Sequence, residues 1–324
     1  MRALVSGFAW LGLFLMIAGE AKGQSGFTYS TIDPPTSGFT EAFGVNEAGQ
    51  VVGDFSTNGA RPFHGFLYSG GRYTTIDVPG AVDTYAFGIN GSGQIVGRYD
   101  SGLFAAPHGF LLNAGNFTTI DVPGSSIGTL AYGINDAGQI VGSPGFLLSG
   151  NRFTTLTVPG PFATDAFGIN SLGQIVGKYE DNNFAVHGFL YSGGSYTTLD
   201  VPGATFTIAD GINDAGDIVG IYGGRFGAEY AFLYRGGTYL TLDYPGAIAT
   251  MTARGINNAG QIVGEYLDAN GQHGFLATPA AAPVPEPSAL LLLITSTFSL
   301  AGYLSLCKYR KYRSALSTAC KVAP

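Results

Sequence analysis

Short apolar runs separated by tight polar turns recur along most of the chain, with a period near 44 residues. The clearest copy is YAFGINGSGQIVGRY, residues 85–99, in which two apolar runs flank an Asn-x-x-Gly turn. The turn asparagine recurs six times, at spacings of 44, 45, 35, 43 and 44 residues: Asn46, Asn90, Asn135, Asn170, Asn213 and Asn257. A repeat of this length is typical of one supersecondary unit used over and over in a single body.

Each copy divides into four runs of strand length. In the second copy these are residues 85–90, 94–99, 108–112 and 117–122, which we name runs a, b, c and d. All are rich in aromatic and β-branched residues. Asn-x-x-Gly joins a to b, and turns such as SGGR join c to d, as in short hairpins. Six antiparallel four-stranded meanders at this period predict an all-β, six-bladed β-propeller; an open solenoid is the alternative.

The two ends of the repeat indicate how the ring closes. Residues 27–33 form a d run with no a, b or c before it, and the last copy has a, b and c but no d. We therefore predict that the N-terminal strand completes the last blade of a propeller spanning residues 24–278. Each a run also carries a glycine near its middle, which we expect to relieve crowding near the axis.

The composition fits many short strands and excludes some partners. Gly accounts for 51 of 324 residues, aromatic residues for 13% and charged residues for only 11%; a disordered chain would be richer in charge and poorer in aromatics. Residues 24–287 contain 8 Lys and Arg against 21 Asp and Glu, a net charge of −13. Nucleic acid and anionic lipid need basic surfaces, so neither is an expected partner. Both cysteines, Cys307 and Cys320, lie outside this body, which we expect to be a monomer without disulfides.

Both ends of the chain carry targeting features. Residues 1–23 combine Arg2, an apolar run and Ala21-Lys22-Gly23, as in a secretory signal peptide cleaved before Gln24; an uncleaved anchor helix is the alternative. After a linker at 279–284, residues 288–306 are 19 residues without a charge, long enough for a transmembrane helix. The basic residues that follow place the tail, residues 314–324, in the cytoplasm and the repeat body outside. They are Lys308, Arg310, Lys311 and Arg313.

The residues before this span are Pro285, Glu286 and Pro287. Pro-Glu-Pro, an apolar span and a basic cluster, residues 285–313, resemble the PEP-CTERM sorting signal of exopolysaccharide-producing Gram-negative bacteria. The resemblance implies processing by signal peptidase and by an exosortase-like enzyme, transient anchoring in the inner membrane, and a final place at the cell surface or in the extracellular matrix. The tail is longer than such signals usually have, and a plain C-terminal anchor is the alternative.

A second resemblance lies in run c. All four histidines of the chain, His64, His108, His187 and His273, precede Gly-Phe-Leu there. With GINxxGQIVG, this resembles the HAF repeat of extracellular bacterial repeat proteins, although Gly replaces the middle Ala in five copies. The resemblance implies export and a propeller-like repeat fold, and it implies no activity.

No residue type in the repeat points to catalysis or to a cofactor. We expect each histidine ring to bond a neighbouring backbone group; a ring of metal ligands is the alternative. The carboxylates that end the d runs precede Pro by two residues and are expected to form Asx turns: Asp33, Asp77, Asp121, Asp200 and Asp243. Asp214 and Asp217 lack the alternating ligands of a calcium loop. Nucleophile, zinc and phosphate-loop motifs are absent from the sequence.

The unequal b–c loops are the candidate binding region, since binding residues usually lie in variable loops on a rigid scaffold. In an a-b-c-d meander the b–c and d–a loops share one face, which we name the loop face; the hairpins form the opposite, turn face. The third b–c loop, Ser143-Pro144, is so short that a notch is expected there. Charged residues that do not follow the repeat are the predicted ligand contacts: Arg61, Asp100, Lys178, Glu180, Asp181, Arg225, Glu229, Glu265 and Asp268.

These features favour an exported, non-enzymatic surface or matrix protein that binds exopolysaccharide or another surface component. The alternative is an extracellular glycan-acting hydrolase or lyase, which would require acidic residues that converge at the axial mouth of the loop face.

Overall fold

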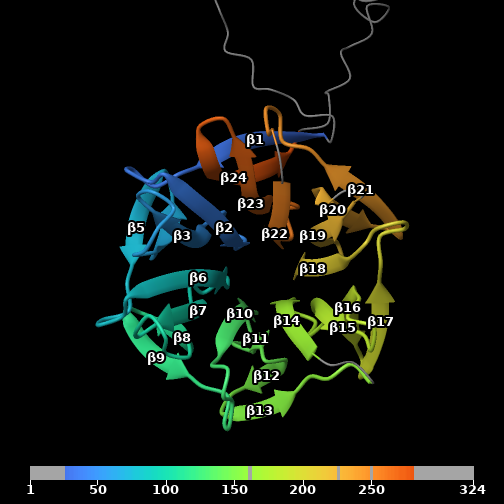
Figure 1. Cartoon of the computed structure of the whole chain (residues 1–324), viewed down its shortest axis with the longest axis horizontal. Coiled ribbons are helices and arrows are strands. Elements are labelled where there is room, and N and C mark those ends of the chain that lie inside the picture. The colour runs from blue at the N-terminus through green and yellow to red at the C-terminus, as the bar shows by residue number, and fades with distance from the viewer. Residues whose placement is uncertain (1–25, 160–162, 225–226, 249–250, 281–324) are drawn as a thin grey trace, which may run out of the picture. The chain divides into compact units, whose positions relative to one another are not determined.

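The computed structural model describes residues 26–280 except 160–162, 225–226 and 249–250. In this part, β-strands are arranged around a central axis as an all-β propeller of four-stranded antiparallel blades (Figure 1). The predicted signal peptide and the predicted span at 288–306 lie outside the described residues. Within the described ranges, no helix has the length and apolar character needed to cross a membrane.

The strands follow the predicted runs closely. Run a forms the inner strands β2 (Phe39–Val45), β6 (Asp83–Ile89), β10 (Leu130–Ile134), β14 (Ala163–Ile169), β18 (Thr207–Ile212) and β22 (Met251–Ile256). Run b forms β3 (Val51–Ser56), β7 (Ile95–Asp100), β11 (Ile140–Ser143), β15 (Ile175–Glu180), β19 (Ile218–Gly223) and β23 (Ile262–Asp268). Run c forms β4 (His64–Ser69), β8 (His108–Asn113), β12 (Phe146–Ser149), β16 (Val186–Ser192), β20 (Glu229–Arg235) and β24 (Gly271–Pro279). Run d forms β5 (Arg72–Ile76), β9 (Asn116–Ile120), β13 (Arg152–Thr155), β17 (Ser195–Leu199), β21 (Thr238–Leu242) and the N-terminal β1 (Phe27–Ile32).

The strand pairing closes the body through its N-terminus. β1 pairs antiparallel with β24, from Phe27 opposite Pro279 to Ile32 opposite Gly274. The prediction that the N-terminal strand supplies the missing fourth strand of the last copy is therefore confirmed. Four sheets are separate four-stranded meanders, and the fifth has eight strands. This differs from the predicted six separate sheets, because one parallel pair, Phe39 with Gln272, joins β2 to β24.

The mid-strand glycines let the inner strands approach one another, as expected. A Cβ on Gly44 would lie 2.7 Å from the carbonyl oxygen of Phe87 on the next inner strand. The same relation continues around the axis and ends with Gly255, whose Cβ would lie 2.5 Å from the carbonyl oxygen of Phe43. Contacts this short leave no room for any side chain, so glycine is required by close approach.

The six glycines that close run b have a different role. Each lies under a fully buried phenylalanine of the third strand: Phe66, Phe110, Phe146, Phe189, Phe232 and Phe275. A Cβ on Gly53, for example, would lie 2.7 Å from the ring of Phe66. Burying an aromatic ring of this size is a large stabilising contribution from each meander.

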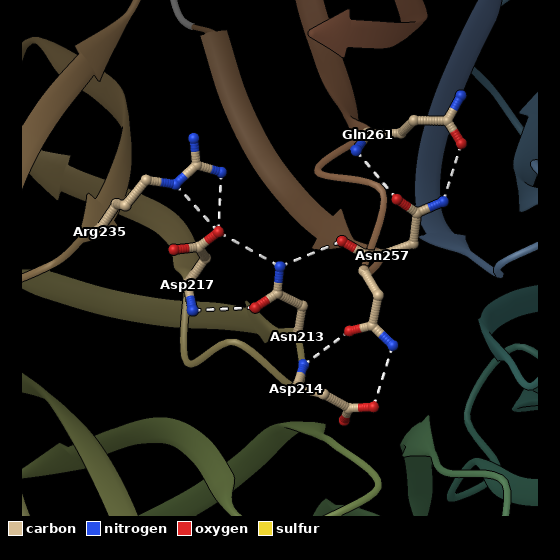
Figure 2. Close-up of polar contacts among 7 residues, drawn as sticks. Asn213, Asp214, Asp217, Arg235, Asn257 and Gln261 are labelled. Atoms are coloured by element: carbon tan, nitrogen blue, oxygen red, sulfur yellow. Dashed lines mark hydrogen bonds and ion pairs between the residues drawn. The ribbon is translucent and has the colours of Figure 1, made fainter.

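The asparagine turns form a closed ring of hydrogen bonds at the turn-face end of the axis. The Oδ1 of Asn46 accepts from the backbone amides of Ala48 and Gln50, and the turn glycines have φ of 70–79°, which confirms the predicted turn. The Nδ2 of each asparagine also donates to the carbonyl of the next, at 2.9–3.2 Å, and Asn257 returns to Asn46. Figure 2 shows the step from Asn213 to Asn257.

One turn departs from the others in a compensated way. Five asparagines donate to a glutamine side chain four residues later, whereas Asn213 donates to Asp217. Asp217 accepts two hydrogen bonds from Arg235, at 2.7 and 3.0 Å (Figure 2). The arginine neutralises a carboxylate that its sheltered position would otherwise destabilise.

The histidines and the aspartates that end the d runs pair with each other, so two local predictions were wrong. The Nδ1 atoms of His64, His108 and His187 lie 2.9–3.0 Å from Asp77, Asp121 and Asp200, and that of His273 lies 2.6 Å from Asp33. The partner of each ring is therefore the carboxylate directly after the outer strand rather than a backbone group, and these four carboxylates bind imidazole rather than cap turns. Strand register explains the pairing, since the two residues lie side by side at the same end of adjacent strands.

Candidate functional site: the axial cavity

Every inner strand contains a β-bulge immediately before its mid-strand glycine. In β2 the register passes from Ala42 directly to Gly44, so that Phe43 is the extra residue. The bulge residues of the inner strands are Phe43, Phe87, Tyr132, Phe167, Asp210 and Arg254. A bulge re-aims its extra side chain and is frequent beside functional sites. Here all six turn toward the axis.

These six side chains, with Ile208, line one cavity of about 310 Å³. Phe43, Phe87, Tyr132 and Phe167 form a continuous arc, with successive ring centroids 5.0, 5.0 and 4.9 Å apart. Asp210 and Arg254 complete the wall. The volume is at the lower end of the range for small-molecule sites, and a largely apolar wall with a few convergent polar groups is their usual composition.

The polar part of the wall is a buried ion network. Arg254 lies 2.9 Å from Glu265 on β23 and 3.5 Å from Asp210 on β18. Burial raises the pKa of Asp210 to about 7, although the nearby Arg254 opposes this. Asp210 Oδ2, Glu265 Oε2 and Arg254 Nε have no hydrogen-bond partner among the described residues. Leaving such buried atoms unpaired is costly.

Two further carboxylates lie at the loop-face side of this network. Glu41 is two residues before Phe43 on β2, is partly exposed, and accepts a hydrogen bond from Gln272 at 2.9 Å. Burial, with the Glu265 carboxylate as a second cause, raises its pKa to about 7. Asp54, directly opposite Glu41 on β3, is 0% exposed, and burial raises its pKa well above the usual range. The loop-face side of the ion network is therefore rich in carboxyl groups that resist ionisation.

The opposite end of the axis is a weaker candidate. A hollow of about 90 Å³ is lined there by the asparagine ring and by the residues that follow it. Its carboxylates are already used: Asp136 accepts from the amide of Gly91, Asp214 from that of Ser171, and Glu47 from that of Asn258. These bonds tie neighbouring turns together, so we assign this end to stability.

The predicted loop-face residues do not form one site. Glu265 is the one among them that belongs to the axial ion network. Lys178, on β15, instead pairs with Asp165 on the adjacent strand β14, at 3.7 Å. Arg61 bridges Asp83 and Asp100 at 2.8 and 3.1 Å and so ties the first b–c loop to β6 and β7.

Among the described residues, the remaining predicted contacts have local partners or lie in other parts of the loop face. Asp181 and Asp268 accept backbone amide hydrogen bonds within their own loops, which lower the pKa of both carboxyl groups, and each lies near a histidine, at 3.8 and 3.2 Å. Glu180 ends β15. Glu229 begins β20 beside a separate hollow, and Arg225 lies outside the described residues. At the predicted notch, Ser143 and Pro144 line a hollow of about 360 Å³.

Sequence reasoning missed the bulge residues, although the sequence contains a signal for them. The position before the mid-strand glycine is aromatic in four copies and becomes Asp210 and Arg254 in the last two. The position after the closing glycine of run b varies similarly and includes Asp54 and Glu265. At both positions a charged residue stands beside a glycine that is the same in every copy, and it occurs in only some copies. The bulge and the strand register bring these charged residues close together.

No protein-family model matches the chain, and no curated protein matches it. Among solved structures, a fucose-specific lectin from Aleuria aurantia matches with 13% identity and a TM-score of 0.44, covering 79% of this chain and 100% of the lectin. The lectin BP39L from Burkholderia pseudomallei matches with 15% identity and a TM-score of 0.41, covering 78% and 85%. A Trypanosoma rangeli sialidase matches with 9% identity and a TM-score of 0.40, covering 81% and 56%. Similarity at this level says nothing about ligand or activity.

Proposed function

We propose that the protein is an exported, non-enzymatic surface or matrix protein whose axial cavity binds a saccharide. The observation that carries the proposal is the joining, in one cavity, of four aromatic rings with the Asp210–Arg254 ion pair. Aromatic faces pack against the apolar faces of sugar rings, whereas carboxylate and guanidinium groups bind hydroxyls through charge-assisted hydrogen bonds. Both kinds of contact are needed to hold a polyhydroxylated ring.

The route of export is part of the same proposal. The predicted signal peptide, the span at 288–306 and the PEP-CTERM-like motif support secretion, processing by an exosortase-like enzyme, and delivery to the cell surface or matrix. The strongly acidic, cysteine-free body fits solubility outside the cell. We also propose that the eight-stranded sheet acts as two blades, giving six in all, because a single residue pair joins its halves.

A second function, glycan hydrolysis or elimination, is favoured by one observation. Asp210 lines the cavity, Glu41 lies two residues before the bulge residue Phe43, and burial raises the pKa of each carboxyl group to about 7. A carboxyl group with such a pKa can remain protonated near neutral pH and donate its proton to a leaving oxygen. A glycan-acting hydrolase or lyase would require acidic residues that converge at the axial mouth of the loop face.

Binding tests the proposal directly. We expect the full-length protein, in a detergent without a sugar headgroup, to bind at least one member of a panel of neutral, acidic and amino oligosaccharides by isothermal titration calorimetry. Replacing Phe87 with Ala should weaken binding about tenfold or more, as expected for a buried aromatic contact. Phe104, which is 100% exposed, provides the matched control, and F104A should bind as wild type does.

Two outcomes would count against saccharide binding at this cavity. One is a folded protein that retains no oligosaccharide of the panel. The other is equal weakening by F87A and F104A. Release of new reducing ends from the same panel, lost in E41Q and D210N, would instead support the hydrolase.

A further inference from the structure

Six pairs of directly opposed side chains surround the axis near the loop face, one residue on each inner strand and one on its neighbour. They are Glu41 with Asp54, Tyr85 with Arg98, Leu130 with Ser143, Asp165 with Lys178, Ile208 with Ile221, and Thr252 with Glu265. Directly opposed residues of an antiparallel pair project from the same face of the sheet and interact. The charge of each pair can therefore be compared from strand to strand.

In the other pairs, each charged side chain has a complement. Lys178 lies 3.7 Å from Asp165, and the guanidinium of Arg98 lies 4.3 Å from the ring centroid of Tyr85. Glu265 is bound by Arg254 at 2.9 Å. Opposite charges and cation–π contacts of this kind stabilise cross-strand pairs.

The pair of Glu41 and Asp54 has no such complement. Two carboxyl groups are directly opposed, which is unfavourable when both are ionised. Neither forms an ion pair within 4 Å among the described residues. Asp54 is fully buried, and both of its carboxylate oxygens lack a hydrogen-bond partner there. The fold therefore keeps two costly carboxyl groups beside the cavity, whose raised pKa values keep them protonated without a cation, and a bound cation would favour their ionisation.

The surroundings of Glu41 favour an organic cation that can donate N–H hydrogen bonds to carboxyl groups and pack against aromatic rings. The charged groups that face it come from several strands: Asp54 on β3, Glu265 on β23, Arg254 on β22 and Arg98 on β7. Both arginines are already bound, to Glu265 and over Tyr85. The arc of aromatic rings begins two residues from Glu41, and aromatic faces attract ammonium groups. In the described part of the chain, no three metal-ligating side chains lie close enough together to hold a metal ion.

We propose that the axial cavity recognises an ammonium group, and that its ligand is a saccharide with free amino groups. The ammonium would lie between Glu41 and the aromatic arc and would favour ionisation of the Glu41–Asp54 pair, so that its binding releases a proton. This inference rests on the proposed saccharide binding and specifies the class of sugar.

A matched pair of ligands tests the inference. One is a tetramer of β-1,4-linked glucosamine, and the other is its fully N-acetylated twin, each titrated into the full-length protein in the same buffer at about pH 6. We expect the free amine to bind about tenfold more tightly, since its ammonium group gives the Glu41–Asp54 pair the cation that it lacks. E41Q and D54N should each reduce this preference to less than about threefold. E180Q removes one carboxylate elsewhere on the loop face and should keep the preference, which excludes general attraction to an acidic protein.

The possible failures are distinguishable. Equal or tighter binding of the N-acetylated tetramer would overturn the ammonium inference but leave saccharide binding intact. Binding of neither tetramer, nor of any other saccharide, would remove both. An amine preference that E41Q and D54N leave unchanged, in variants with melting temperatures at or above that of wild type, would place recognition elsewhere and also overturn the inference.

Discussion

Asn257 donates a hydrogen bond from its side-chain amide to the backbone carbonyl of Asn46 at 2.9 Å, although 211 residues separate the two. This bond closes the ring of six asparagines, so the first and last inner strands are joined in the same way as any adjacent pair. The N-terminal β1 closes the outer rim through β24. The body is thus closed at two radii, near the axis and at the periphery.

The closing asparagine should therefore matter for stability. Replacing Asn257 with Ala removes its bonds to Asn46 and Gln261 and leaves buried partners unpaired. We expect a loss of about 2–3 kcal/mol in the free energy of unfolding, measured by urea denaturation. Asn116, an exposed residue whose amide bonds only a local carbonyl, is the control; N116A should change stability by less than about 0.5 kcal/mol. Equal stability of the two variants would show that the ring is not a stabilising closure.

The exceptional pair of Asp217 and Arg235 can be converted to the arrangement of other turns. Gln50 donates to Ser69, and Gln174 to Ser192, in the equivalent places. R235S alone should cost about 1–3 kcal/mol, because it leaves a largely buried carboxylate without its cation. The double variant D217Q/R235S should recover to within about 1 kcal/mol of wild type. Thermal unfolding of the wild type, both single variants and the double variant measures this coupling, and an additive double variant would refute it.

The buried carboxyl groups predict an unusual dependence of stability on pH. Burial raises the pKa of Glu41 from 4.5 and that of Asp210 from 3.8, each to about 7. Between about pH 4 and 7 the folded state therefore holds more protons than the unfolded state, so stability falls as pH rises through this window. The lowered pKa values of Asp181 and Asp268 act only below their ordinary value of 3.8 and do not offset it.

Urea denaturation at intervals from about pH 5 to 8 tests this expectation. Wild type should lose about 1–3 kcal/mol over the range for each group of this kind. E41Q and D210N should each flatten the profile, whereas E180Q should leave it unchanged. A wild-type protein that becomes more stable from pH 5 to 8 would contradict the assigned direction.

Local patterning predicted the strands, the asparagine turns, the close approach at the mid-strand glycines and the role of β1. These depend on periodicity and turn chemistry within one repeat, which the sequence displays directly. The pairing of His64 with Asp77 depends on register between adjacent strands, and turn chemistry alone pointed to other partners. The axial cavity was harder still to predict from the sequence, because a bulge turns one residue of each inner strand toward the axis. Phe43 and Arg254 come from the first and last copies of the repeat and meet there on neighbouring strands, which no single repeat reveals.

The crowding of the inner strands gives a final prediction. A Cβ on Gly133 would lie 2.6 Å from the carbonyl oxygen of Phe167 on the neighbouring inner strand. G133A must therefore push two inner strands apart, and we expect a loss of about 3 kcal/mol or more, or failure to fold, as for other overpacked sites. Gly102, whose added Cβ would meet its nearest heavy atom at 3.9 Å in a b–c loop, is the control. G102A should change stability by less than about 0.5 kcal/mol. Because the displaced strands carry the bulge residues, a G133A protein that does fold should also bind saccharide less tightly than G102A. Unchanged unfolding and binding in G133A would show that the inner strands are not packed at the distance that positions the cavity.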